Sequence, residues 1–285
     1  DIPASAFAAE LPKGCYIIPE EKKLTWSVSR EVNDATVFYV REGLIPKKFK
    51  NVGVNVQNEF ITRYHNDNIL GILPGDEQDS FLVFTAHYDH LGHMGDSVHA
   101  VFPGASDNAS GTAMMLYLAD YFAKHPHKYT MLFIAFAGEE AGLMCSEVYL
   151  YQPTVSVTNI KYLVNLDIMG DAKNGITIVN ALKNQELVDT LKQINLRKEY
   201  LPYIKLRDNA ANSDHYHFSK AGVPSVFIYS NGGDGHYHDV YDKARAVSLY
   251  NIDRVAALLI DMVNSFNPVI EPAAEPQLPV EDIVK

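Results

Sequence analysis

Four short apolar runs, each followed by acidic or histidine residues, constrain the fold of this chain more than any other feature. The runs are residues 81–86, 131–137, 162–166 and 223–229. Their length and lack of charge predict strands that are buried on both faces, as in a parallel sheet covered by helices. Because ligands of open α/β sheets bind beyond the carboxyl ends of the strands, the four polar ends predict one shared crevice.

The residues at these ends are of types that bind metal or carry protons. They are His87 and Asp89, then Glu139 and Glu140, then Asp167, and last a glycine-rich loop with His236 and His238. Two adjacent carboxylates at the mouth of a sheet repel each other and lose hydration. They are tolerated best where a cation compensates them or where one of them holds a proton. The pattern therefore predicts a catalytic site.

The remaining patterns fit an α/β fold. Residues 110–124 and 246–266 have helical apolar spacing, and residues 68–74 predict a further strand. The alternation at 52–56 and 59–63 predicts antiparallel strands at the edge of the sheet. We expect a three-layer α/β sandwich with a central mixed, mostly parallel sheet flanked by helices.

Three parts of the chain are expected. Residues 1–65 would form an N-terminal edge segment packed on the catalytic domain, which would span residues 66–266. Residues 267–285 are rich in Pro, Glu and Ala and predict an extended tail.

Composition excludes several classes of protein. The chain has 285 residues, of which 47% are apolar, and this is enough for one full core. A net charge of −11 and the lack of a Lys- or Arg-rich cluster argue against nucleic acid as a partner. The longest apolar stretches run about ten residues, short of the roughly twenty that span a bilayer. We expect no transmembrane segment, and no pattern indicates the oligomeric state.

The cysteines and the first residue bear on the compartment. Cys15 and Cys145 allow one disulfide, but Cys145 falls in an expected helix, where a buried free thiol is the commoner state. The sequence begins at Asp1 without an initiator methionine or a hydrophobic signal segment. This start suggests a mature or trimmed form of a longer protein and leaves export open.

The candidate ligands suit a site for two metal ions. They are two imidazoles and three carboxylates from five separate loops: His87, Asp107, Glu140, Asp167 and His238. Zinc binds histidine nitrogen and carboxylate oxygen at about 2.0–2.2 Å, and catalytic zinc sites keep a position open for water. With five ligands one carboxylate must bridge both ions, and Asp107, at a predicted helix start, is the natural bridge.

Six motifs in order resemble those of metallopeptidase family 28, the co-catalytic di-zinc aminopeptidases of the bacterial leucyl aminopeptidase type. The motifs are HYDHLG from His87, GASDNASG from Gly104, AGEE from Ala137, NLDIMG from Asn165, SDHYHF from Ser213 and HYHDVYD from His236. The resemblance covers roughly residues 66–265 and implies the zinc exopeptidase fold and an exported protein, periplasmic or extracellular. Residues 1–65 add little to it.

The resemblance also implies a role for each site residue. It makes His87 and Asp167 ligands of one zinc and Glu140 and His238 ligands of the other, with Asp107 between them. Glu139 would be the general base, and Asp89 would orient His87. In the family the ligand histidine lies four residues before an aspartate, and His238 precedes Asp242 by four, whereas His236 has no aspartate at that offset. We therefore favour His238.

Other residues of these motifs are candidates for the substrate pocket. Asp214 and His215 match a family motif near the pocket. Phe218, Phe227 and Tyr229 lie in or beside the late motifs, and we expect some to line an apolar pocket and at least one to pack in the core. For the remaining histidines near the site, His90, His93, His99 and His217, we expect polar loop or pocket-wall positions.

The implied function is a zinc aminopeptidase with two zinc ions per chain. It would hydrolyse the N-terminal peptide bond of peptides that have a free N-terminus, through a metal-bridging water and Glu139. The preferred first residue is not encoded, although the family favours leucine. Three alternatives stay open: a glutaminyl-peptide cyclotransferase on the same fold, a carboxypeptidase, for which no basic recognition pocket is evident, and a non-catalytic binding protein. His and carboxylate sites also accept manganese and cobalt.

Overall fold

The computed structural model describes residues 11–46, 48, 50–56, 59–63, 65–94, 100–233 and 235–266. The expected tail over 267–285 and His99 lie outside these residues. Within them, both cysteines are free, which agrees with the preference stated above. No described helix combines the length and the apolar character needed to cross a membrane.

The centre of the molecule is a seven-stranded mixed sheet with the order β10-β9-β11-β8-β4-β7-β3. The strands are β3 (Ile69–Leu73), β4 (Glu77–His87), β7 (Tyr129–Phe136), β8 (Ile160–Leu166), β9 (Ile176–Val179), β10 (Ile204–Leu206) and β11 (Ser225–Ser230). The four central strands, β11, β8, β4 and β7, run parallel to one another. The pairs β3–β7 and β11–β9 are antiparallel. The predicted mixed, mostly parallel sheet is confirmed.

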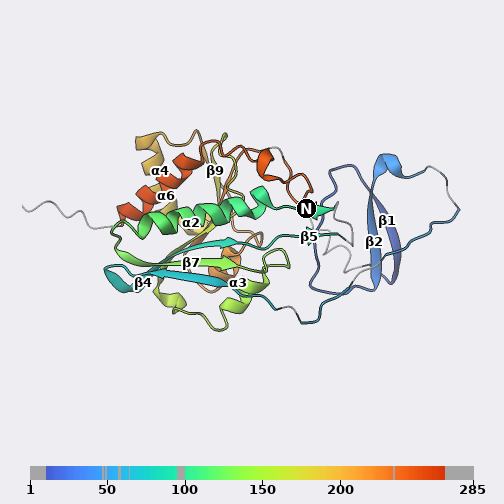
Figure 1. Cartoon of the computed structure of the whole chain (residues 1–285), viewed down its shortest axis with the longest axis horizontal. Helices are drawn as coiled ribbons and strands as arrows, with labels where there is room; N and C mark the ends of the chain where they lie inside the picture. Colours follow the sequence, from blue (N-terminus) through green and yellow to red (C-terminus); the bar gives the residue numbers. More distant parts are fainter. Residues whose placement is uncertain are drawn as a thin grey trace, which may run out of the picture.

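Helices cover both faces of the sheet, so the predicted three layers are present (Figure 1). One face packs against α2 (Gly111–Phe122), α4 (Gln185–Lys198) and α6 (Ile252–Ser265), and the other against α3 (Met144–Tyr149) and α5 (His215–Lys220). Alternate residues of β4 explain this arrangement, because Phe84 faces the first helical layer and Val83 faces the second. The central strands are therefore buried on both sides.

Two details of the sequence prediction need correction. Residues 52–56 and 59–63 form no strand in the structure, and the sheet ends instead at β3, whose partner β7 takes up its backbone hydrogen bonds. The alternation in these segments therefore reflects no strand pairing. The last helix begins at Ile252 rather than at residue 246, because a short helical turn at Ala244–Ala246 and an extended stretch precede it.

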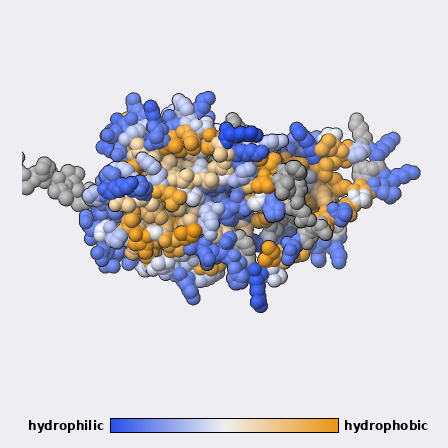
Figure 2. All heavy atoms as spheres, in the orientation of Figure 1, coloured by the Kyte–Doolittle hydropathy of each residue, from blue (hydrophilic) through white to orange (hydrophobic). Residues whose placement is uncertain are grey.

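The N-terminal segment forms a small sheet of its own. Strands β1 (Gly14–Glu20) and β2 (Ala35–Arg41) pair in parallel and stand apart from the main sheet, beyond the two-residue strand β5 (Gly92–His93) (Figure 1). β5 pairs with β6 (Val101–Phe102). In the view of Figure 2 hydrophobic side chains reach the surface of both parts. Exposed hydrophobic side chains of the N-terminal segment include those of Leu24, Trp26, Val28, Phe60 and Ile61.

Candidate metal and catalytic site

The carboxyl ends of the four central parallel strands meet at one place, as the sequence predicts. β4 ends on His87, β7 leads to Glu139 and Glu140, β8 leads to Asp167, and β11 leads to the loop with His238. Because these strands are adjacent and parallel, their ends lie side by side. The polar ends therefore share one crevice.

The five candidate ligands lie within contact of one another, with Asp107 in the middle. One oxygen of Asp107 is 3.2 Å from His87 Nε2, and the other is 3.4 Å from His238 Nε2. On the outer sides, Asp167 Oδ1 is 3.4 Å from His87 Nε2 and Glu140 Oε2 is 3.1 Å from His238 Nε2. The structure thus brings His238, and not His236, to the cluster.

Two buried atoms at the centre have no hydrogen-bond partner among the described residues: His87 Nε2 and Asp167 Oδ1. Both side chains are almost fully buried, and so is that of Asp107. A buried polar atom without a partner costs free energy, and a cation between these atoms would remove that cost. The residues present therefore fit a divalent metal ion.

The acids and imidazoles perturb one another strongly. Burial alone would lower the pKa of His87, but Asp167, Asp107 and Asp89 raise it well above its usual value. Burial likewise opposes the effect of Asp107 and Glu140 on His238, yet they raise its pKa to about 9. Burial raises the pKa of Asp167. These shifts follow from three acids and two bases packed together out of water.

The loop that carries Asp107 is held by glycines at both ends. Gly104 has φ +64°, and a Cβ there would lie 2.6 Å from the carbonyl oxygen of Asp107 and 2.7 Å from the ring of His90. At Gly111 a Cβ would collide with the Asn108 side chain and with the carbonyl of Leu166. The GASDNASG motif therefore needs its first and last residues to be glycine so that the loop can approach its neighbours.

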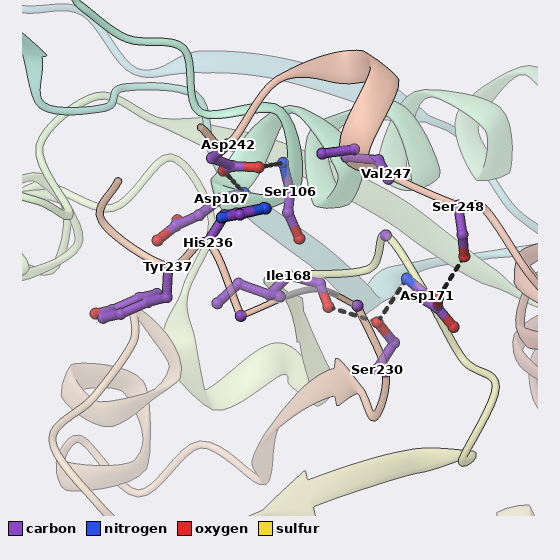
Figure 3. A pocket seen from close by; sticks show the side chains of 15 residues that line it. Ser106, Asp107, Ile168, Asp171, Ser230, His236, Tyr237, Asp242, Val247 and Ser248 are labelled. Atoms are coloured by element: carbon purple, nitrogen blue, oxygen red, sulfur yellow. Dashed lines mark hydrogen bonds between the residues drawn. The ribbon is translucent and has the colours of Figure 1, made fainter. Parts of the chain in front are cut away.

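Asp242 fixes the same loop from outside. Its two carboxylate oxygens accept hydrogen bonds from the backbone N–H groups of Ser106 at 2.8 Å and of Asp107 at 3.0 Å (Figure 3). Its backbone oxygen accepts a third bond from the N–H of Ala105. Asp242 is 2% exposed and lies four residues after His238. The loop of one candidate ligand thus anchors the loop of another.

A buried chain of hydrogen bonds leads to Asp167. The Thr85 hydroxyl donates to Asn165, the Asn165 amide donates to Ser213, and the Ser213 hydroxyl donates to Asp167 Oδ2, each at 2.7 Å. Because the donor direction is the same at each step, Asp167 receives a proton donor on one oxygen and leaves the other facing His87. No pattern in the sequence indicates that Thr85 or Ser213 supports a candidate ligand.

Asp89 holds two parts of the site at once. Its carboxylate accepts the backbone N–H groups of Glu139 and Glu140, both at 3.2 Å. The nitrogen Nδ1 of His87 lies 3.1 Å from the carbonyl oxygen of Asp89 and 3.6 Å from its carboxylate. The expected orienting contact to His87 therefore runs mainly through the backbone carbonyl. The carboxylate positions the pair of glutamates.

Glu139 and Glu140 differ in environment. Burial raises the pKa of Glu139 well above its usual value. The pKa of Glu140 is lowered despite burial, because His238 and His90 hydrogen-bond to its carboxylate. His90 Nδ1 lies 2.7 Å from Glu140 Oε1. His90, for which we expected a polar loop or pocket-wall position, thus contacts the candidate ligand Glu140 directly.

A recess of about 200 Å³ opens beside Glu139. Its lining consists of Asp107, Glu139, Asp167, Ile168, Arg207, Asn212, Phe227, Tyr229 and Tyr237. Phe227 and Tyr229 therefore lie where a substrate pocket was expected. Phe218 does not: it is fully buried on α5, with ring centroids 6.1 Å from Phe136 and 5.8 Å from Tyr149. It therefore packs in the core, as expected for at least one of the three, and a pocket position for it is wrong.

Tyr237 and Arg207 are among the residues of this recess that no sequence pattern had indicated. Tyr237 stacks on His238 with ring centroids 3.8 Å apart. Arg207 donates to the Tyr229 hydroxyl at 3.1 Å. The position of Tyr237 directly before His238 in the sequence was the signal that could have identified it. Arg207 has no such signal, because it follows β10, a strand from the far edge of the sheet.

Asp214 and His215 are buried behind the site rather than exposed in it. Both oxygens of Asp214 lack a hydrogen-bond partner among the described residues, and burial raises its pKa to about 7. His215 begins α5, its Nε2 lies 3.2 Å from Asn209 Oδ1, and burial lowers its pKa to about 4. The ring of His215 lies 5.6 Å from that of Phe227, so the pair backs the recess.

Comparisons with known proteins identify relatives. Peptidase family M28 matches residues 68–263. Leucine aminopeptidase 1 of Neurospora crassa is 26% identical over 199 residues, which are 64% of this chain and 49% of that protein. Among solved structures, a zinc aminopeptidase from Bacillus subtilis is 26% identical with a TM-score of 0.58, covering 70% of this chain and 49% of that one.

A glutaminyl cyclase from an Acidobacteriales bacterium has a similar fold, with 23% identity and a TM-score of 0.57 over 70% of this chain and 72% of that one. The chain spans about half the length of the curated leucine aminopeptidase that it matches. The family match covers the whole main sheet and every candidate ligand. On that match, the chain belongs to peptidase family M28.

Proposed function

We propose that this protein is a zinc-dependent aminopeptidase. The proposal rests mainly on the position of Asp107 between His87 and His238. Asp167 lies on the outer side of His87, Glu140 lies on the outer side of His238, and Glu139 lies beside the cluster. Zinc aminopeptidase and leucine aminopeptidase are the names of relatives at 26% identity, which supports this activity over others on the same fold.

In this proposal the chain holds two zinc ions. His87 and Asp167 would bind one, His238 and Glu140 the other, and Asp107 both. Zinc would supply a Lewis acid and lower the pKa of water toward about 7. The carbonyls of Asp89 and Trp26 lie 3.1 Å and 2.8 Å from the Nδ1 atoms of His87 and His238. Each would accept the Nδ1 proton and leave Nε2 free to bind metal.

Glu139 is the proposed general base. It lies among the candidate ligands without being held by His238 or His90, as Glu140 is. Its raised pKa suits a carboxylate that takes a proton from attacking water and returns it to the leaving amine. The backbone bond to Asp89 fixes the turn on which it lies.

The proposed substrate is a peptide with a free N-terminus. The recess beside Glu139 has aromatic and aliphatic walls from Phe227, Tyr237 and Ile168, so we propose that it takes an apolar first side chain. The acids at its base would attract the protonated α-amine. Acetylation of that amine removes the charge and should slow cleavage by about 10²-fold or more.

The test is a panel of free and N-acetylated leucyl peptides together with a peptide that begins with glutamine. Rapid cleavage of the free peptides alone supports the proposal. Equal cleavage of free and blocked peptides would rule out an aminopeptidase. Release of pyroglutamyl product from the glutaminyl peptide would assign the cyclase activity instead.

Two further parts of the proposal concern the whole chain. We propose that residues 66–266 form the catalytic domain and that residues 1–65 pack on it, supported by the bonds from Lys23, Trp26 and Arg30 to its loops. Export to the periplasm or the exterior stays a prediction of the family resemblance. Fractionation of the native host tests it.

A further inference from the structure

A part of the N-terminal segment crosses the site. Residues 23–30, called the strap below, lie outside the family match. Lys23 Nζ donates to the carbonyl oxygens of Gly235 and Tyr237 at 2.9 and 3.0 Å and lies 2.8 Å from an oxygen of Asp239. The strap is thereby tied to the loop that carries His238.

The strap is attached at two further points. The Trp26 ring stacks on Phe102 with centroids 6.5 Å apart, and Arg30 reaches the carbonyl of Gly142 at 3.4 Å and the carboxylate of Glu147 at 3.2 Å. Gly142 follows the Glu139–Glu140 turn. The strap therefore passes from the His238 loop to the loop of the two glutamates.

A cleft of about 630 Å³ lies between the N-terminal segment and the catalytic loops. Its first wall is Val28, Ser29, Arg30, Glu59, Phe60, Ile61, Thr62, Arg63 and His65; its second is Asp89, His90, Leu91, Glu140, Ala141 and Met144. The volume falls within the range of about 300–1,000 Å³ that is typical of ligand sites. The cleft is thus large enough for a ligand, and one of its walls comes from residues 28–65, which lie before the part of the chain that matches the family.

The cleft and the recess beside Glu139 flank the catalytic centre. They share no lining residue, and the boundary falls between neighbours in the sequence, since Glu139 lines the recess and Glu140 lines the cleft. If the first side chain of a peptide occupies the recess, the chain beyond the scissile bond has the cleft as its space.

The charge of the cleft changes from one wall to the other. The catalytic wall carries Asp89 and Glu140, whereas the N-terminal wall carries Arg30 and Arg63, with Glu59 as its one acid. Arg30 is engaged with Glu147. Arg63 is exposed and has no ion-pair partner in the described part of the chain. A free guanidinium facing such a cleft is suited to a carboxylate, which it can bind with two parallel hydrogen bonds.

We propose that this cleft binds the C-terminal carboxylate of a short peptide through Arg63, which makes the protein an aminopeptidase selective for di- and tripeptides. The inference rests on the proposed aminopeptidase activity. The acids around Glu139 would receive the amine end, and Arg63 the carboxylate end. An oligopeptide would have to pass between the strap and the catalytic loops.

The experiment measures kcat/KM of the zinc-loaded full chain on leucine p-nitroanilide, on Leu-Gly, Leu-Gly-Gly and Leu-Gly-Gly-Gly, each as free acid and as amide, and on Leu-Asp-amide. For the di- or tripeptide the free acid should exceed the amide by at least about 10-fold, the effect of one charge-assisted contact. Arg63→Ala should bring this ratio close to one. Arg41→Ala, which removes an exposed arginine of β2 outside the cleft, should preserve it.

The outcomes separate the two proposals. If leucine p-nitroanilide and every peptide are left uncleaved, the aminopeptidase proposal fails, and this one fails with it. If they are cleaved but acid and amide turn over equally, or if the preference survives Arg63→Ala, only the carboxylate site is refuted. If the protein prefers Leu-Asp-amide over Leu-Gly-amide but shows no preference for free acids over amides, Arg63 binds an acidic side chain of the substrate. That result would overturn the selectivity for di- and tripeptides.

Discussion

The side chain of Asp242 holds the backbone of Asp107: one carboxylate oxygen of Asp242 accepts the N–H of Asp107 at 3.0 Å. The carboxylate of Asp107 itself stays free to face His87 and His238. This bond joins the loop after β11 to the loop before α2. The position of Asp107 thus depends on Asp242, whose bonds to this loop involve neither His87 nor His238.

Asp242→Asn should weaken metal binding by about 10- to 100-fold, the usual effect of losing a residue that orients a ligand. The amide nitrogen of Asn would face a backbone N–H, so one of the two bonds to the loop is lost. Competition with a chromogenic chelator measures the affinity. Asp171→Asn is the matched control, because Asp171 lies in the same pocket but bonds to Ser248 and Lys173. Equal losses in both variants would contradict the assignment.

Glu139→Gln and Glu140→Gln should separate base from ligand. The first should keep its metal and lower kcat by a factor of about 10² or more, because an amide cannot accept the proton from water. The second should lose metal, since Glu140 is the carboxylate next to His238. Metal content by mass spectrometry and kcat are measured on the same samples. The reverse pattern would show that the two roles are exchanged.

Asp107→Asn should be the most damaging ligand substitution. Two divalent ions about 3.5–4 Å apart need a shared anion, and a neutral amide does not balance their charge. We expect about two zinc ions per wild-type chain, fewer than one in the variant, and loss of wild-type activity on chelation with recovery on adding zinc. A fully active wild type with one ion or none would refute the two-metal site.

His215 should make the fold sensitive to acid. Its pKa is lowered to about 4 in the folded protein, against about 6.5 in an unfolded chain. As the pH falls, the unfolded chain therefore binds the proton before the folded protein does. The contribution of neutral His215 to stability is complete above pH of about 6.5 and is lost as the pH falls toward 4. Urea denaturation measures the free energy of unfolding at each pH. Over this range the wild type should lose about 3 kcal/mol of that free energy more than His215→Gln, whose amide can still donate to Asn209.

The comparison isolates His215 because Asp214 titrates in both proteins. Burial raises the pKa of Asp214 to about 7, so its own effect has the opposite sign: stability falls as the pH rises from about 4 toward 7. Parallel stability curves for wild type and variant would show that His215 is not buried as described.

The sequence by itself determined the parallel sheet and the residue types at its ends. Apolar runs such as 81–86 and 131–137 have apolar side chains on both faces of a strand, which a sheet buries when helices cover both of its faces. Parallel strands then bring His87 and Glu140 to one edge of that sheet. The offset between His238 and Asp242 pointed to the histidine that the structure places beside Asp107. Local pattern sufficed for the sheet because it acts through the strand direction alone, and the choice of His238 came from the spacing within a family motif.

Tertiary structure decided the contacts between residues far apart in the sequence. Phe218 has the same apolar character as Phe227, and only the packing of α5 shows that one lies in the core and the other at the recess. The same holds for His90 beside Glu140, for Trp26 beside His238 and for the arginines of the cleft. These contacts depend on how loops and the N-terminal segment close over the sheet, and no periodicity in the chain records that closure.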